Sequence, residues 1–235
     1  RSVHRNTAVH RACHDGHGGV IRVLADCKAN LNRLDSHDEA ALHIACDRGH
    51  AGTMRVVADC QEDVNVRNKT GMSPLHSACA AGQVAVVHEL RALGADMNAV
   101  DRRGYSALMY AAKNGHAAVV ASLVGHEADV NARVGSDGQT ALHIAAGKGH
   151  TVAVAALLRY GADANCQDRI GRSPLWYSTG ADLACELEEL LRGSGERLVY
   201  ITDEYLSFDQ AYVGEVRRQE AARLMVMLCG IQRLL

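Results

Sequence analysis

Several features that often characterise a protein are scarce in this chain of 235 residues. It contains one Phe, one Trp and two Pro, whereas it has 22 Gly and many small residues such as Ala. A core of large aromatic side chains is therefore excluded, and thin helices packed closely by small residues fit the composition. No apolar run reaches the roughly 18 residues needed to span a bilayer, so we expect no membrane insertion.

Charge of one sign and catalytic motifs are also missing. The formal net charge is −2, which provides no global attraction to nucleic acid, and we expect none to bind. The sequence has no nucleophile elbow, paired-carboxylate motif or kinase motif set. Gly147-Lys148 resembles the end of a phosphate loop, but Leu142 stands at the position of the first glycine and Gly149 replaces the final Ser or Thr. We therefore expect neither enzyme activity nor a cofactor.

What the chain does contain is a repeat of about 33 residues. Copies begin at residues 7, 40, 73, 106, 140 and 173, at separations of 33, 33, 33, 34 and 33. The clearest copies start Ala40-Ala41-Leu42-His43, Ser73-Pro74-Leu75-His76 and Thr140-Ala141-Leu142-His143. A fixed period of this length indicates stacked units, none of which buries its apolar face alone. Such a chain presents a long surface, so we expect it to hold another macromolecule.

Residues 73–105 illustrate one unit. Ser73 is a suitable N-cap for a helix, and the apolar spacing from Val84 to Leu93 predicts a second, amphipathic helix. Gly94 then supplies a left-handed residue, and residues 101–104 form a projecting turn. The unit is therefore a helix, a short turn, a second helix and a protruding hairpin.

The position of Gly94 is not always glycine in the other copies. The column consists of Lys28, Gln61, Gly94, Glu127 and Gly161. A non-glycine residue in the left-handed region costs on the order of 1 kcal/mol, so we expect Gln61→Gly and Glu127→Gly to stabilise the fold. One extra residue before Thr140 predicts a longer hairpin around Ser136.

These motifs resemble the ankyrin repeat signature. The resemblance rests on Ser73-Pro74-Leu75-His76, on Gly115-His116 and on Gly94-Ala95-Asp96-Met97-Asn98. It covers about residues 7–172 in five copies, with a degenerate sixth copy from Ser173. It implies an all-α solenoid whose hairpin fingers and first helices line a concave face. The activity that it implies is protein–protein recognition without catalysis.

We predict two parts in the chain. An ankyrin repeat domain spans residues 1–180, and a C-terminal helical segment for capping or docking spans residues 193–235. The repeats are placed near 7–39, 40–72, 73–105, 106–139, 140–172 and, in degenerate form, 173–192.

Three functions stay open at this point. The first is a non-catalytic scaffold. The second is a substrate adaptor of a ubiquitin-ligase complex, because Leu228–Leu235 faintly resembles the box that links some ankyrin proteins to ubiquitin ligases. Its spacing is one residue short and the usual downstream prolines are absent. The third is a regulatory or targeting domain of a larger enzyme or channel.

The eight cysteines do not form a disulfide pattern. Cys13, Cys46 and Cys79 occupy one repeat column, and Cys27 and Cys60 occupy another. Neighbouring repeats lie about 8–10 Å apart, whereas a disulfide needs Cα atoms within about 7 Å. We interpret both columns as small buried residues, which predicts a reducing compartment, either the cytoplasm or the nucleus.

Two columns also account for most of the 13 histidines. The columns are His10, His43, His76 and His143, and then His17, His50, His116 and His150. Members of a column lie too far apart to share a metal ion, whose ligands sit about 2 Å away. The resemblance instead implies hydrogen bonds within and between repeats, and we expect no metal site.

A column of asparagines follows the second helices and contains Asn32, Asn65, Asn98, Asn131 and Asn165. The resemblance implies that these residues tie each hairpin to its neighbours. A leucine lies eight residues before Asn98, Asn131 and Asn165, which resembles the pattern accepted by asparaginyl hydroxylases that act on ankyrin repeats. We therefore name these three as possible hydroxylation sites.

The resemblance places partner contacts at the finger tips and at the ends of the first helices. The expected contact residues are Lys69, Met72, Arg102, Arg103, Tyr105, Lys113, Asn114, Lys148, Arg169 and Arg172. Arginine and tyrosine dominate interface hot spots, so we expect the middle stretch to anchor an acidic or polar segment of a protein partner. We expect the chain itself to be monomeric.

Overall fold

The structure is a computed structural model that describes residues 6–178, apart from residues 32, 37, 61, 62, 127 and 134. The helices within this part are α1 (Ala8–His14), α2 (Gly18–Asp26), α3 (Ala41–Asp47), α4 (Ala51–Asp59), α5 (Pro74–Ala80), α6 (Val84–Ala92), α7 (Ala107–Lys113), α8 (Ala117–Val124), α9 (Ala141–Gly147), α10 (Thr151–Arg159) and α11 (Pro174–Tyr177). The predicted all-α solenoid is confirmed. The described residues contain no strand, although an isolated bridge joins Val100 to Ser106.

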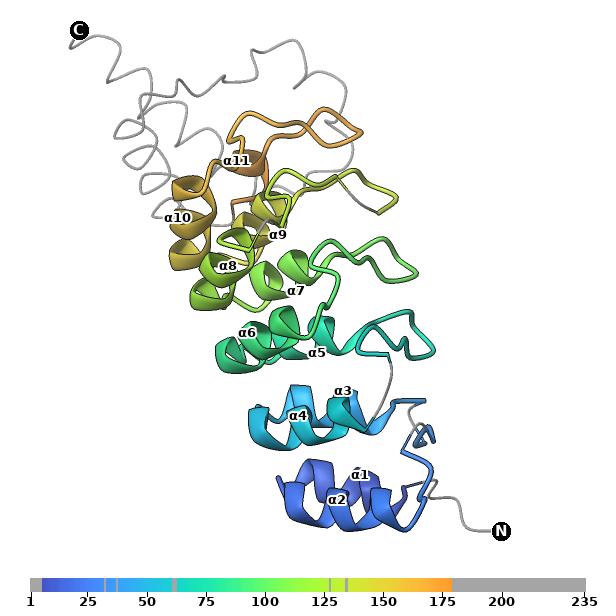
Figure 1. The fold of residues 1–235 in the computed structure, drawn as a ribbon. Coiled ribbons are helices and arrows are strands. Elements are labelled where there is room, and N and C mark those ends of the chain that lie inside the picture. Colours follow the sequence, from blue (N-terminus) through green and yellow to red (C-terminus); the bar gives the residue numbers. More distant parts are fainter. Residues whose placement is uncertain are drawn as a thin grey trace, which may run out of the picture.

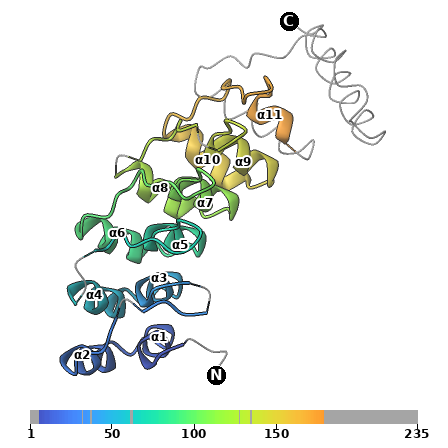
Figure 2. The same ribbon diagram turned by 90° about the vertical axis from the view of Figure 1, so that its right-hand side faces the viewer.

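The helices are arranged in pairs that stack along one axis (Figure 1). The second helices of the pairs form one row, the projecting hairpins lie on the opposite side, and the first helices lie between them. A view from the side shows the same two rows of helices (Figure 2). Each helix therefore packs against its equivalent in the next repeat, as α3 does against α5 and α6 does against α8.

Local sequence explains where the first helices begin and end. In α5 the N-cap Ser73 and His76 form a capping box, and Pro74 occupies the first turn, where a missing N–H costs nothing. Leu75 and Cys79, on the inner face of α5, are 1% and 0% exposed. The helix ends before Gly82, whose φ of +78° is a conformation that glycine adopts readily.

A single elongated core runs through the stack. The first helices contribute fully buried leucines such as Leu42 and Leu142, and the second helices contribute Leu90, Leu123 and Leu157. Most of the helices are only seven to nine residues long, and a pair of them cannot bury its apolar face alone. Consecutive repeats therefore share this core.

The interpretation of the cysteines was right for one column and wrong for the other. Cys13, Cys46 and Cys79 are fully buried and free, and burial raises the pKa of each thiol. Cys27 and Cys60 are free but exposed. The reason is that each follows the last residue of a second helix, α2 or α4. The second helices form the row opposite the fingers, which we call the outer row (Figure 1).

The left-handed column behaves as predicted where it is described. Gly94 and Gly161 have φ values of +82° and +83°, and Lys28 adopts +60° without being glycine. Gln61 and Glu127 lie outside the described residues. The hairpin with the extra residue carries two left-handed glycines, Gly135 and Gly138.

The described residues include only the start of the sixth repeat, as α11. The rest of segment 173–192, the C-terminal segment 193–235 and the adaptor motif at Leu228–Leu235 lie outside the described residues. Among the helices that the structure does describe, none is long and apolar enough to cross a membrane.

Candidate functional site

Five hairpins, called fingers here, project from the stack at residues 35–39, 68–72, 101–105, 135–139 and 168–172. Four of them start with a buried Asp or Asn whose side chain organises the turn. In the third finger, Asp101 Oδ1 accepts hydrogen bonds from the backbone N–H of Arg103 and of Tyr105, both at 2.8 Å. Asn68 and Asp168 make the same pair of bonds in their own fingers. These four fingers are therefore held by a buried side chain at their first residue.

Two of these carboxylates are also held by a tyrosine from the following helix. The hydroxyl of Tyr110 donates to Asp101 Oδ2 at 2.9 Å, and that of Tyr177 donates to Asp168 Oδ2 at 2.6 Å. Burial and the neighbouring carboxylate raise the pKa of each tyrosine to about 12. Sequence reasoning missed this pairing, although the recurrence of Asp or Asn at 35, 68, 101 and 168 is a signal that could have found the finger anchors.

Three histidines of the first column connect a first helix to the finger that ends the same repeat. The Nε2 atoms of His43, His76 and His143 lie 2.9, 3.1 and 3.0 Å from the carbonyl oxygens of Met72, Tyr105 and Arg172. Burial lowers the pKa of all three histidines, so the neutral ring is favoured. The expected hydrogen bonds within repeats are confirmed for these three histidines, whereas His10 Nε2 has no hydrogen-bond partner in the described part of the chain.

The second column joins the ends of neighbouring first helices. The Nε2 atoms of His50, His116 and His150 lie 3.1, 3.0 and 3.0 Å from carbonyl oxygens of the preceding repeat. Across the residues that the structure describes, no group of three or more His, Cys, Asp or Glu side chains is placed to hold a metal ion. Hydrogen bonding to carbonyl oxygens thus accounts for six of the eight column histidines, all except His10 and His17.

The asparagine column ties consecutive repeats together, as the resemblance implied. The Oδ1 atoms of Asn65, Asn98 and Asn131 accept hydrogen bonds from the backbone N–H of the residue 31 or 32 positions on, at 2.8 to 2.9 Å. The amide of Asn131 also donates to the Gly161 carbonyl at 3.0 Å. Hydroxylation at Asn98, Asn131 or Asn165 stays a prediction.

The fingers and the first helices α1, α3, α5, α7 and α9 together form what we call the recognition face. The residues predicted to contact a partner lie on it: Lys69, Arg102, Arg103, Lys113, Asn114, Lys148 and Arg169 are exposed, whereas Met72, Tyr105 and Arg172 are half-buried. Fingers also contact one another, since the Arg102 N–H donates to the Thr70 carbonyl at 3.0 Å.

Three of the predicted contact residues already use their side chains within the protein. Lys69 lies 3.1 Å from a carboxylate oxygen of Asp38, and the Asn114 amide donates to the Ala80 carbonyl at 2.7 Å. Arg172 forms an ion pair with Asp168 at 3.0 Å and lies over the Trp176 ring at 4.5 Å. These side chains are therefore less available to a partner.

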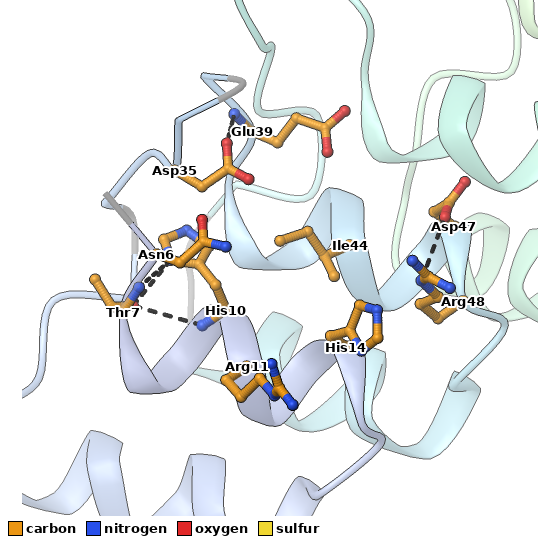
Figure 3. Close-up of a pocket in the computed structure, with 10 residues that line it drawn as sticks. All are labelled: Asn6, Thr7, His10, Arg11, His14, Asp35, Glu39, Ile44, Asp47 and Arg48. Atoms are coloured by element: carbon orange, nitrogen blue, oxygen red, sulfur yellow. Dashed lines mark hydrogen bonds and ion pairs between the residues drawn. The ribbon is translucent and has the colours of Figure 1, made fainter. Parts of the chain in front are cut away.

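A pocket of about 510 Å³ opens on the N-terminal part of the recognition face. It lies between α1, α3 and the first finger (Figure 3), and its lining residues are Asn6, Thr7, His10, Arg11, His14, Asp35, Glu39, Ile44, Asp47 and Arg48. The lining mixes both signs of charge, and Arg11 and Arg48 contact the neighbouring Asp15 and Asp47. Such a pocket suits polar contacts with a partner.

A stack of helix pairs with a row of projecting fingers defines a helical repeat solenoid. Within that class, the family model "Ankyrin repeats (3 copies)" matches residues 2–68 and 56–134, and the model "Ankyrin repeat" matches residues 137–169. The chain belongs to the ankyrin repeat family.

A solved structure supports the same assignment. The ankyrin repeat domain of Bcl-3, described as a unique member of the IkappaB protein family, is 32% identical and superposes with a TM-score of 0.69. The match covers 78% of this chain and 82% of that chain. No curated protein sequence matches significantly. Solenoids of this kind use extended surfaces for binding, and the chain is a protein–protein interaction domain.

Proposed function

We propose that the recognition face binds a protein partner and that the domain is a non-catalytic scaffold. Two structural features support this proposal. Four of the five fingers are anchored by a buried Asp or Asn, and the fingers project from the same side of the stack as the first helices (Figure 1). A pre-organised face loses little conformational entropy when a partner binds.

The observation that carries the proposal is the state of Arg102 and Arg103 at the tip of the third finger. Both side chains are exposed, and neither guanidinium has an ion-pair partner among the described residues. Tyr105 belongs to the same repeat as the two arginines, and Lys113, at the end of α7, belongs to the next repeat. Arginine donates bidentate, charge-assisted hydrogen bonds to carboxylates, so we infer that this region binds an acidic or polar segment.

The test compares two double charge reversals in the full chain. Arg102→Glu with Arg103→Glu alters the recognition face, whereas Arg91→Glu with Arg159→Glu alters exposed arginines in the last turns of α6 and α10. Both variants change the formal net charge by the same amount. Quantitative mass spectrometry of affinity-purified protein should show a partner that is lost only with the first variant. Equal recovery with both variants would exclude this surface.

We also propose that the chain is monomeric and that it lies in a reducing compartment, the cytoplasm or the nucleus. The free thiols support the choice of compartment, since all six described cysteines are unpaired and two of them, Cys27 and Cys60, are exposed. Light scattering of the purified chain in the presence of a reductant should give the monomer mass. Localisation of the tagged chain to a secretory compartment would contradict the proposed reducing compartment.

A further inference from the structure

Two histidines that belong to neither repeat column face each other on the outer row of helices. His88 lies in α6 and His126 lies just after the end of α8, and the Nδ1 atom of His88 is 3.0 Å from the Nε2 atom of His126. Their rings are nearly perpendicular, with centroids 5.0 Å apart. The equivalent positions one repeat earlier are Arg55 and Leu93, so stacking of the repeats does not require this pair.

A third side chain orients the His88 ring. The hydroxyl of Ser122 in α8, which is 9% exposed, lies 3.5 Å from His88 Nε2. When Nε2 carries the proton and faces this hydroxyl, the lone pair of Nδ1 is left facing His126. Histidines that ligate metals are usually oriented in this way by an oxygen on their other ring nitrogen.

We propose that His88 and His126 form a two-histidine site for a divalent first-row transition-metal ion. Imidazole nitrogens bind such ions at about 2.0–2.1 Å. Two ligands at that distance are separated by about 2.8–3.0 Å at a right angle and by about 3.3–3.4 Å in a tetrahedron. The hydrogen-bonded nitrogens already lie 3.0 Å apart, so Ni²⁺ or Cu²⁺ in tetragonal or octahedral geometry requires less change in their separation than tetrahedral Zn²⁺ does.

Binding replaces the hydrogen bond between the rings. The bridging proton moves through water from Nε2 to Nδ1 of His126, so both facing nitrogens present a lone pair on a neutral ring. Each ring turns slightly so that the two lone pairs converge on one ion. His88 is exposed and His126 is half-buried, so the protein does not oppose this movement. The ion connects the third repeat to the fourth, and water completes its coordination. Because an ion held in this way stabilises only the folded state, it raises the melting temperature by mass action.

The experiment titrates Ni²⁺ into the full, untagged chain by isothermal calorimetry. Wild type is compared with His88→Ala, His126→Ala, the double variant and the control His14→Ala, which alters an exposed histidine whose contact is Asp15. We expect each single variant, and equally the double variant, to lose one Ni²⁺ equivalent that the control retains. Above the dissociation constant, each tenfold increase in Ni²⁺ should raise the melting temperature of wild type by about 3–5 °C, and that of the single variants less.

A measurement on the unaltered chain removes any dependence on how the variants fold. Substoichiometric Cu²⁺ should broaden the ring resonances of His88 and His126 before those of other histidines in the NMR spectrum. Single variants that bind as many Ni²⁺ equivalents as wild type, or earlier broadening of other histidines, would overturn the proposal.

Discussion

Ala40 leaves a gap in a hydrogen-bond pattern that the first helices α1, α5 and α9 complete. In α5 and α9 the N-cap hydroxyls of Ser73 and Thr140 lie 2.8 and 2.9 Å from Nδ1 of the histidine three residues on. In α3 the N-cap is Ala40, and the fully buried His43 Nδ1 has no hydrogen-bond partner within the described part of the chain. His43 Nε2 contacts the Met72 carbonyl at 2.9 Å, which places the ring proton on Nε2 and leaves Nδ1 as an acceptor.

We therefore predict that Ala40→Thr stabilises the protein. An N-cap hydroxyl contributes about 1 kcal/mol, and satisfying a buried acceptor contributes about 1–3 kcal/mol before the cost of burying the new hydroxyl. A net gain of about 1–2 kcal/mol corresponds to a rise in melting temperature of about 2–8 °C for a domain of this size. Thr140 occupies the same position in α9 while only 1% exposed, so the side chain fits this environment.

The matched control is Ala40→Val, which has the shape of threonine without its hydroxyl. Urea unfolding followed by circular dichroism should show Ala40→Thr to be more stable than Ala40→Val by about 1–2 kcal/mol. The reverse change, Ser73→Ala, should lose a similar amount, because it removes the same contact from His76. Equal stability of the threonine and valine variants would refute the reasoning, since the hydroxyl would then contribute nothing.

Three further predictions concern stability and can be measured by urea unfolding. Lys28→Gly should stabilise the protein by about 0.5–1 kcal/mol, because relief of left-handed strain exceeds the added entropy of the unfolded chain, and a loss of stability would contradict it. The free energy of unfolding should decrease as the pH falls below 6.5, the ordinary pKa of histidine, because burial lowers the pKa of His76 and the unfolded chain binds the proton. His76→Met should reduce that dependence by up to about 1.4 kcal/mol per pH unit, and an unchanged slope would exclude this assignment. Tyr110→Phe should cost about 1–2 kcal/mol because Asp101 loses a partner, whereas Tyr160→Phe, at an exposed tyrosine, should change stability by less than about 0.5 kcal/mol.

Much of the fold was predictable because it depends on interactions between residues close in sequence. The N-cap at Ser73, the helix from Val84 and the left-handed turn at Gly94 follow from local backbone chemistry, and all three occur. The regular period then implied that equivalent helices pack on one another. The exposure of Cys27 was not predictable in this way, because it depends on which side of the outer row the helix end faces.

The candidate site was predictable in outline but not in detail. Repeat position placed Arg102, Asn114 and Arg172 on the recognition face, yet only the structure shows that Asn114 holds the Ala80 carbonyl and that Arg172 is paired with Asp168. Whether a surface side chain is available to a partner depends on its neighbours, which lie in the same finger for Arg172 and across a repeat boundary for Asn114. The period identifies those neighbours, but not the rotamers that bring them into contact.

The sequence by itself determined the family, the order of the helices and the general position of the fingers, because these follow from local propensities repeated at a constant interval. The tertiary structure alone decided which side chains meet between repeats. His88 and His126 are 38 residues apart and touch, whereas members of the histidine columns bond to backbone carbonyls. Such contacts depend on the offset between stacked helices, which arises only when the apolar faces pack together.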